Sequence, residues 1–236
     1  MKKRFSALSF IVIIAMLTLQ NNAIPVELSA GATTWYTAWD YEDDASSDVK
    51  YDPAFLYGPA LSLAMTPDFS MSFVFLYGEF DMDTGSGTIP IKRFDSDLTL
   101  NYRTGNYFKI FAGAKYVGFT WEDDGRHRAF GPGAGISAVF PIGGNFFILG
   151  YLSGMYLIGT EDGDKSMDYK AEQKEYGFNS SLSLAYYLQA ASTTISLGAR
   201  YQQVNIDYDS TEDGMVSDSR SNFYGITLAA VYTLNI

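Results

Sequence analysis

The sequence predicts an all-β fold, an up-and-down antiparallel transmembrane β-barrel with ten strands. Three observations predict it. Apolar and polar residues alternate with a period of two in several segments, short and long connections between these segments alternate along the chain, and acidic residues gather in the long connections. The 236 residues fit one β domain, and 18 Tyr, 17 Phe and 22 Gly are typical of a β-rich chain.

The first thirty residues have the layout of a secretory signal peptide. Three basic residues follow Met1, and an apolar run from Leu8 to Leu19 then leads into small residues. This run is shorter than the ~20 residues that a membrane-spanning helix needs. The triplet 30–32 has the A-x-A form, so we expect cleavage after Ala30, with Ala23 and Ala32 as alternatives. The expected domains are a signal peptide over 1–30 and a barrel over 31–236.

The alternation is clearest between Lys92 and Arg103. Even positions such as Phe94 and Leu98 are apolar, and odd positions carry charged or polar side chains. The same period predicts ten strands, at about 32–41, 54–66, 69–80, 92–104, 107–121, 128–141, 145–160, 175–188, 193–208 and 221–236. The pattern is weak in the first and seventh of these, glycine-rich in the sixth and apolar on both faces in the third, so eight or twelve strands remain open.

The connections divide the barrel into two rims. Short ones at 67–68, 105–106, 142–144 and 189–192 alternate with long ones at about 42–53, 81–91, 122–127, 161–174 and 209–220. After residue 30, only Asp68, Asp95 and Asp97 among the acidic residues lie outside the long connections and the strand ends beside them. Charge in a strand middle that faces hydrocarbon is unfavourable by roughly 2–4 kcal/mol for Lys or Arg and less for Asp or Glu. This segregation therefore favours a membrane barrel over a soluble sandwich.

Composition excludes several functions. The net charge of −11 argues against nucleic-acid binding, because an acidic chain repels phosphate. The absence of cysteine excludes disulfides and thiolate chemistry, and one histidine excludes a multi-His metal site within one chain. We expect no cofactor.

With these features, residues 31–236 resemble a small bacterial outer-membrane β-barrel of unassigned activity. The last strand, 221–236, is similar to the signal read by the barrel-assembly machinery, since Leu234, Tyr232 and Ala230 alternate from the end, although Ile236 stands where such barrels usually carry Phe. The resemblance implies a monomer surrounded by outer-membrane lipid in a diderm bacterium. It also implies periplasmic termini and extracellular long loops.

Seven charged residues share the polar face of the strands and predict a charge network in the lumen: Arg93, Asp95, Asp97, Arg103, Lys109, Lys115 and Arg200. Two interpretations remain open. The network is either a constriction that selects ions by charge, or a set of opposite charges that fills and braces a narrow lumen.

The acidic loops suggest diffuse binding of divalent cations, with the candidate ligands Asp43, Asp44, Asp162, Asp164, Asp209 and Asp213. None of these runs has the spacing of a dedicated calcium loop, and the alternative interpretation is a solvated surface. Tryptophans and tyrosines near strand ends, Trp35 and Trp39 among them, are interpreted as an aromatic girdle, with a sugar-binding platform as the competing interpretation.

The case for an enzyme is weak. Ten-strand omptin proteases use paired acidic residues at the loop-side strand ends with an Asp-His pair opposite, and Asp81 and Asp83 are similar to the first pair. The one histidine, His127, lies on a different connection, so the required general base is absent, and we expect His127 to be a surface residue. We therefore expect no enzyme but a structural or surface-interaction protein, with a narrow passive channel for small solutes or ions as the alternative and an omptin-like protease less favoured.

Overall fold

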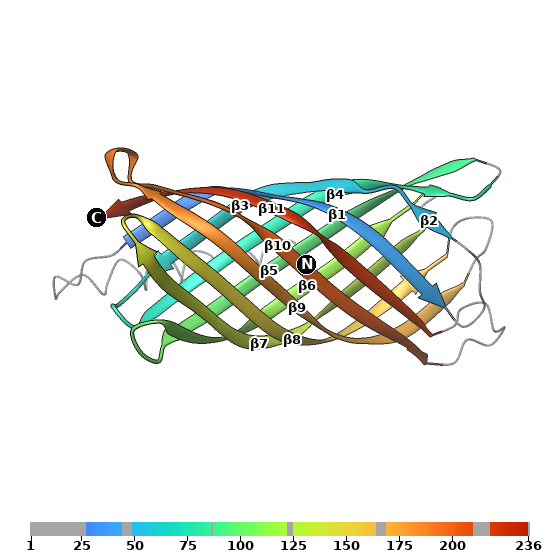
Figure 1. Ribbon diagram of the computed structural model, residues 1–236. Helices are drawn as coiled ribbons and strands as arrows, with labels where there is room; N and C mark the ends of the chain where they lie inside the picture. The colour runs from blue at the N-terminus through green and yellow to red at the C-terminus, as the bar shows by residue number, and fades with distance from the viewer. Residues whose placement is uncertain are drawn as a thin grey trace, which may run out of the picture.

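The computed structural model describes residues 27–43, 49–85, 87–121, 125–163, 169–209 and 218–235, which form ten long strands and one short one. The strands run diagonally around a cylinder (Figure 1). They are β1 (Glu27–Asp43), β2 (Lys50–Tyr51), β3 (Ala54–Ala64), β4 (Phe69–Asp83), β5 (Thr88–Arg103), β6 (Phe108–Thr120), β7 (Arg126–Gly143), β8 (Phe146–Asp162), β9 (Lys170–Leu188), β10 (Thr193–Asp209) and β11 (Ser219–Asn235). A 3-10 turn at Gln189–Ala191 joins β9 to β10. Among the described residues, no helix is long and apolar enough to cross a membrane.

The ten long strands close into a barrel. Each is antiparallel to both of its neighbours, in the order β4-β3-β1-β11-β10-β9-β8-β7-β6-β5, and β5 pairs again with β4. The seam between the first and last strands runs from Glu27 opposite Asn235 to Asp43 opposite Ser219. The predicted ten-strand antiparallel barrel is therefore confirmed. Closure leaves none of these long strands with a free edge, which protects the barrel from edge-to-edge aggregation.

The strands reach further toward the long-connection rim than the side-chain pattern indicates. β4 and β5 stay paired as far as Asp83 and Thr88, so the predicted connection over 81–91 is wrong in extent. The hairpin turns at Gly85, whose φ of 74° favours glycine, and the Thr84 amide donates to the Gly87 carbonyl. Backbone pairing continues here because ladder hydrogen bonds do not require an apolar face.

The first strand begins at Glu27, within the stretch interpreted as the signal peptide. Residues 27–30 pair with β11 on one side and β3 on the other. Cleavage after Ala30 would remove this pairing, whereas cleavage after Ala23 would leave β1 whole. The cleavage site stays a prediction, and residues 1–26 lie outside the described residues.

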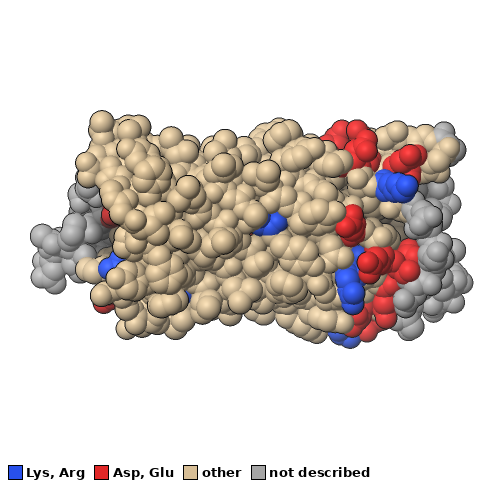
Figure 2. All heavy atoms as spheres, in the orientation of Figure 1, with Lys and Arg blue, Asp and Glu red and all other residues tan. Residues whose placement is uncertain are grey.

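The outside of the barrel is apolar between two rims. Leu100, Leu182, Leu197 and Ile226 are more than half exposed on the outside, as suits a surface that faces lipid. Aromatic residues lie toward each end of this belt, including Phe69, Tyr102 and Tyr232 near the short turns and Tyr36, Phe55, Tyr156 and Tyr176 near the other end. Figure 2 shows acidic side chains gathered at the end away from the C-terminus, with the rest of that face almost uncharged.

Candidate functional site

A plug of side chains fills the lumen from its middle toward the long-connection rim. Nine strands contribute side chains that are less than 2% exposed, and β7 adds Ala129 at 2%. We call this set the plug: Trp35, Thr37, Leu56, Leu76, Phe80, Arg93, Val117, Leu157, Gln173, Glu175, Gln202 and Phe223. A ten-strand barrel is only slightly wider than the eight-strand barrels that side chains fill, so these large residues can close it.

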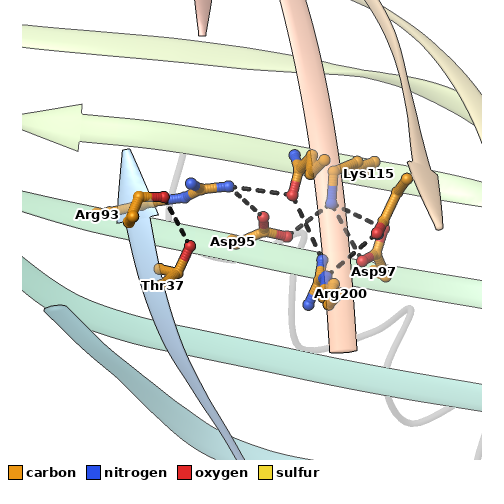
Figure 3. Close-up of polar contacts among 9 residues, drawn as sticks. Thr37, Arg93, Asp95, Asp97, Lys115 and Arg200 are labelled. Atoms are coloured by element: carbon orange, nitrogen blue, oxygen red, sulfur yellow. Dashed lines mark hydrogen bonds and ion pairs between the residues drawn. The ribbon is translucent and has the colours of Figure 1, made fainter. Parts of the chain in front are cut away.

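A chain of charges runs through the plug. Arg93 Nη2 donates to Asp95 Oδ2 at 2.9 Å and to Gln202 Oε1 at 3.1 Å. Lys115 Nζ lies 2.6 Å from Asp95 Oδ1 and 3.1 Å from Asp97 Oδ2. Figure 3 shows these side chains pointing toward one another from β5 and β6 inside the barrel. Asp95 thus balances two buried cations, which satisfies the need of buried charges for partners.

Aromatic rings complete the surroundings of the Arg93 guanidinium. Its Cζ lies 3.7 Å from the centroid of the Phe223 ring and 5.5 Å from that of Trp35. Its Nε and Nη1 have no hydrogen-bond partner, so the ring face replaces part of their solvation. Arg93 is 0% exposed.

Arg200 links the plug to a cavity on the short-turn side. Its Cζ lies 4.3 Å from the Trp35 ring centroid, and its Nε donates to Asn179 Oδ1 at 3.2 Å. The cavity, which we call the lower cavity, measures about 360 Å³ and is lined mostly by small and polar side chains, including Ser72, Asp97, Ser181, Ser183, Ser196 and Thr227.

Not all of the predicted network comes together. The structure joins Arg93, Asp95, Asp97 and Lys115 directly, and Arg200 through Gln202. Arg103 and Lys109 lie opposite each other where β5 and β6 approach the short-turn rim. Both residues occupy lumen-facing positions on their strands, but they lie closer to the short-turn rim than the plug does. Selection of ions by these residues stays a prediction.

A second cavity, which we call the mouth cavity, lies at the long-connection rim. It measures about 330 Å³ and is lined largely by aromatic side chains, including Trp39, Tyr41, Tyr51, Phe119, Trp121, Tyr169 and Tyr208. Trp39 is held in the wall of this cavity: its ring stacks on Tyr51 at 3.7 Å between centroids, and its indole Nε1 donates to Ser221 Oγ at 3.1 Å. The short strand β2 positions Tyr51 by pairing with the end of β4.

His127 and Glu161 line this cavity, and Glu175 contacts His127 from behind the cavity wall. The His127 Nε2 lies 2.7 Å from Glu175 Oε1, and its Nδ1 lies 3.2 Å from Glu161 Oε2. The phenol hydroxyls of Tyr169 and Tyr208 each donate a hydrogen bond to the Glu161 carboxylate at 2.6 Å. The cluster lies outside the membrane-spanning part of the barrel, because its outward-facing neighbours Arg126, Arg128 and Asp162 are charged.

The two carboxylates keep His127 charged. Burial alone lowers the pKa of His127, but the charge of Glu175 and the hydrogen bonds to Glu161 and Glu175 outweigh this effect and raise the pKa to about 9. Burial raises the pKa of Glu161, and the bond and charge of His127 reverse this and lower it. His127 is therefore an imidazolium at neutral pH. It cannot accept a proton there, which a general base must do.

Two sequence interpretations are corrected here. His127 is not a surface residue but is 3% exposed, at the start of β7. Trp35 and Trp39 point into the lumen and are 0% and 7% exposed, so they do not belong to an outer girdle. β1 alternates poorly because it carries aromatics on both faces, with Tyr36 exposed outside. Only their shared odd-numbered positions on β1 could have indicated the inward direction.

The candidate cation ligands do not form one site among the described residues. Asp162 accepts from Arg128 at 2.9 Å and Asp209 from Lys174 at 2.7 Å, and Asp43 lines the mouth cavity. Asp44, Asp164 and Asp213 lie outside the described residues. Within the described ranges, no group of three or more His, Asp or Glu side chains is arranged to hold a metal ion. Diffuse cation binding stays a prediction.

Comparison with solved structures agrees with the closed barrel. The outer membrane protease OmpT from Escherichia coli matches with a TM-score of 0.58 at 11% identity, over 90% of this chain and 97% of that one. This chain has the fold of an outer-membrane β-barrel. Weaker matches include the β domain of the Bordetella autotransporter BrkA, with a TM-score of 0.49 at 11% identity over 90% and 100% of the two chains. Another is OprG from Pseudomonas aeruginosa, at 0.37 and 12% over 91% and 97%. No family model and no curated protein matches the chain.

Proposed function

We propose that this chain is an integral β-barrel of a bacterial outer membrane with a non-conducting lumen and a structural or surface-interaction role. The observation that carries this proposal is the plug. Nine of the ten long strands contribute to it, and the mouth and lower cavities on its two sides have no lining residue in common. Paired charges and large rings that fill the lumen stabilise the barrel. The acidic rim is then the surface through which the protein interacts with other molecules.

The proposed placement follows from the asymmetry of the rims. The short-turn rim, with both termini, faces the periplasm, and the acidic long-connection rim faces outward. The chain is a monomer in outer-membrane lipid, and the barrel-assembly machinery reads its C-terminal strand, 221–236. The unbroken apolar belt supports this placement.

The state of His127 supports a non-enzymatic role. In the protease interpretation, this histidine would serve as a general base near Asp81 and Asp83. Instead it is held as a cation between Glu161 and Glu175, while Asp81 and Asp83 are exposed at the end of β4. The likeness to OmpT is one of fold alone.

A narrow channel is the alternative, favoured by the two cavities at opposite ends of the lumen. Planar bilayer recordings of the purified protein separate the two functions. We expect no stepwise conductance from the wild type, and steps from Trp35→Ala combined with Phe223→Ala, which removes two rings from the plug. Steps from the wild type that change with Lys109→Glu or Arg200→Glu would instead establish the channel.

A further inference from the structure

The mouth cavity combines aromatic walls with carboxylates. Of the residues that the structure describes, seven Trp, Tyr and Phe side chains line it, alongside the apolar side chains Met82, Ile91 and Ile206. Its charged lining residues are Asp43, Glu161 and His127, and no Lys or Arg is among the described residues that line it. A cavity of about 330 Å³ is at the small end of the range for ligand sites, so it suits a small molecule.

Among the described lining residues, the charges of this cavity are not balanced. His127 is neutralised by Glu161 and by Glu175 beneath it, and Glu161 is satisfied by its three hydrogen-bond donors. Asp43 is left over, because its Oδ1 is buried without a hydrogen-bond partner. Within the part of the chain that the structure describes, no Lys, Arg or His forms an ion pair with this carboxylate oxygen.

These features select one kind of ligand. Electron-rich ring faces attract a cation that sheds little hydration, such as an alkylated ammonium, and a carboxylate adds an ion pair. An anionic ligand would meet the charges of Asp43 and Glu161. A sugar would need several neutral hydrogen-bonding groups, whereas the hydroxyls of Tyr169 and Tyr208 are already bonded to Glu161.

We propose that the mouth cavity binds a small organic ammonium ion, with the aromatic walls of the cavity against its alkyl groups and Asp43 against its charge. β1 carries both Trp39 and Asp43, and β2 brings Tyr51 onto the Trp39 ring at an interplanar angle of 16°. The site lies on the long-connection side of the plug, and ligand binding there does not depend on whether the lumen conducts.

Choline and its neutral carbon isostere, 3,3-dimethylbutan-1-ol, test the proposal. Tryptophan fluorescence of the purified wild type in detergent reports binding, because Trp39 and Trp121 line the cavity. We expect choline to change the emission saturably and the isostere to bind about tenfold more weakly. Phosphocholine should also bind more weakly, since its phosphate meets the acidic rim; tighter binding of phosphocholine would overturn the assignment to a free ammonium ion.

Two variants locate the site. Asp43→Asn should weaken choline binding about fivefold or more, while Glu42→Gln, the exposed neighbour on the opposite face of β1, should leave it unchanged. A heat-modifiable band on gels confirms that both variants fold. Equal binding of choline and the isostere, no saturable binding of choline, or equal binding to Asp43→Asn and the wild type would each overturn the proposal.

Discussion

Among the described residues, Asp95 is the one carboxylate that contacts both Arg93 and Lys115. Asp95→Asn keeps the shape but removes the charge, and leaves two buried cations without their shared partner. We expect the free energy of unfolding to fall by about 3 kcal/mol or more. Urea unfolding in detergent micelles, followed by tryptophan fluorescence, measures this change. Asp68→Asn in an exposed short turn is the matched control, and an equal effect of the two substitutions would contradict a stabilising role for the network.

His127 gives the barrel a pH dependence on the alkaline side. Its pKa is about 9 when folded, against an ordinary 6.5 when unfolded, so the stabilisation is fully present below about pH 6.5 and is lost as the pH rises through about 9. The loss amounts to about 3 kcal/mol at most. Burial raises the pKa values of Tyr51 and Tyr208, which remain neutral over this window.

Urea midpoints of the wild type should therefore decline between about pH 6 and pH 10. His127→Gln removes the titrating group while Glu161 and Glu175 remain, and should flatten this decline. A wild-type midpoint that stays constant over the range, or a variant that declines just as steeply, would show that His127 does not gain its charge from folding.

For single residues, the sequence predicts whether a side chain points into the lumen better than it predicts how far along the barrel axis that side chain lies. Parity along β5, β6 and β10 places Arg93, Lys115 and Arg200 inside the barrel, and it also selects Arg103. It cannot sort the plug from the rim, because depth depends on the tilt of strands that are far apart in the chain. His127 was missed for the same reason, since its partners come from β8 and β9.

The seam between β1 and β11 is the element on which closure depends. Gly225 lies opposite Thr37, and a side chain there would collide with the backbone carbonyl of Tyr36. We expect Gly225→Val to prevent closure, so that the heat-modifiable band is lost. Gly150→Val is the control, because open space surrounds that glycine. A Gly225→Val variant that still folds into a barrel would show that β1 and β11 can move apart at this position without loss of closure.

Strand positions could be predicted because lipid and lumen impose opposite chemistry on alternate residues. All ten predicted segments correspond to strands, including the weak ones at β1 and β8. Strand ends beyond the apolar belt could not, because the outward positions there, such as Asp81 and Asp83, are acidic and exposed and therefore resemble a loop, while pairing continues. β2 has only two residues, too few for a periodic signal.

The whole molecule is divided along its axis. An aromatic, acidic mouth lies at one end, a plug lies in the middle, and a polar cavity lies toward the short turns. Net charge could be assigned to one rim from the sequence, as Figure 2 illustrates for the described residues. The filling of the lumen could not, because it depends on which inward side chains meet across the barrel.

Labelling of single cysteines from each side of the membrane tests the plug most directly. The chain has no cysteine, so Met82→Cys in the mouth cavity and Ser181→Cys in the lower cavity each provide one reactive site. With the protein in vesicles of one orientation, a small impermeant thiol reagent should reach Met82→Cys only from the long-connection side and Ser181→Cys only from the short-turn side. Labelling of either cysteine from both sides would contradict a plugged lumen.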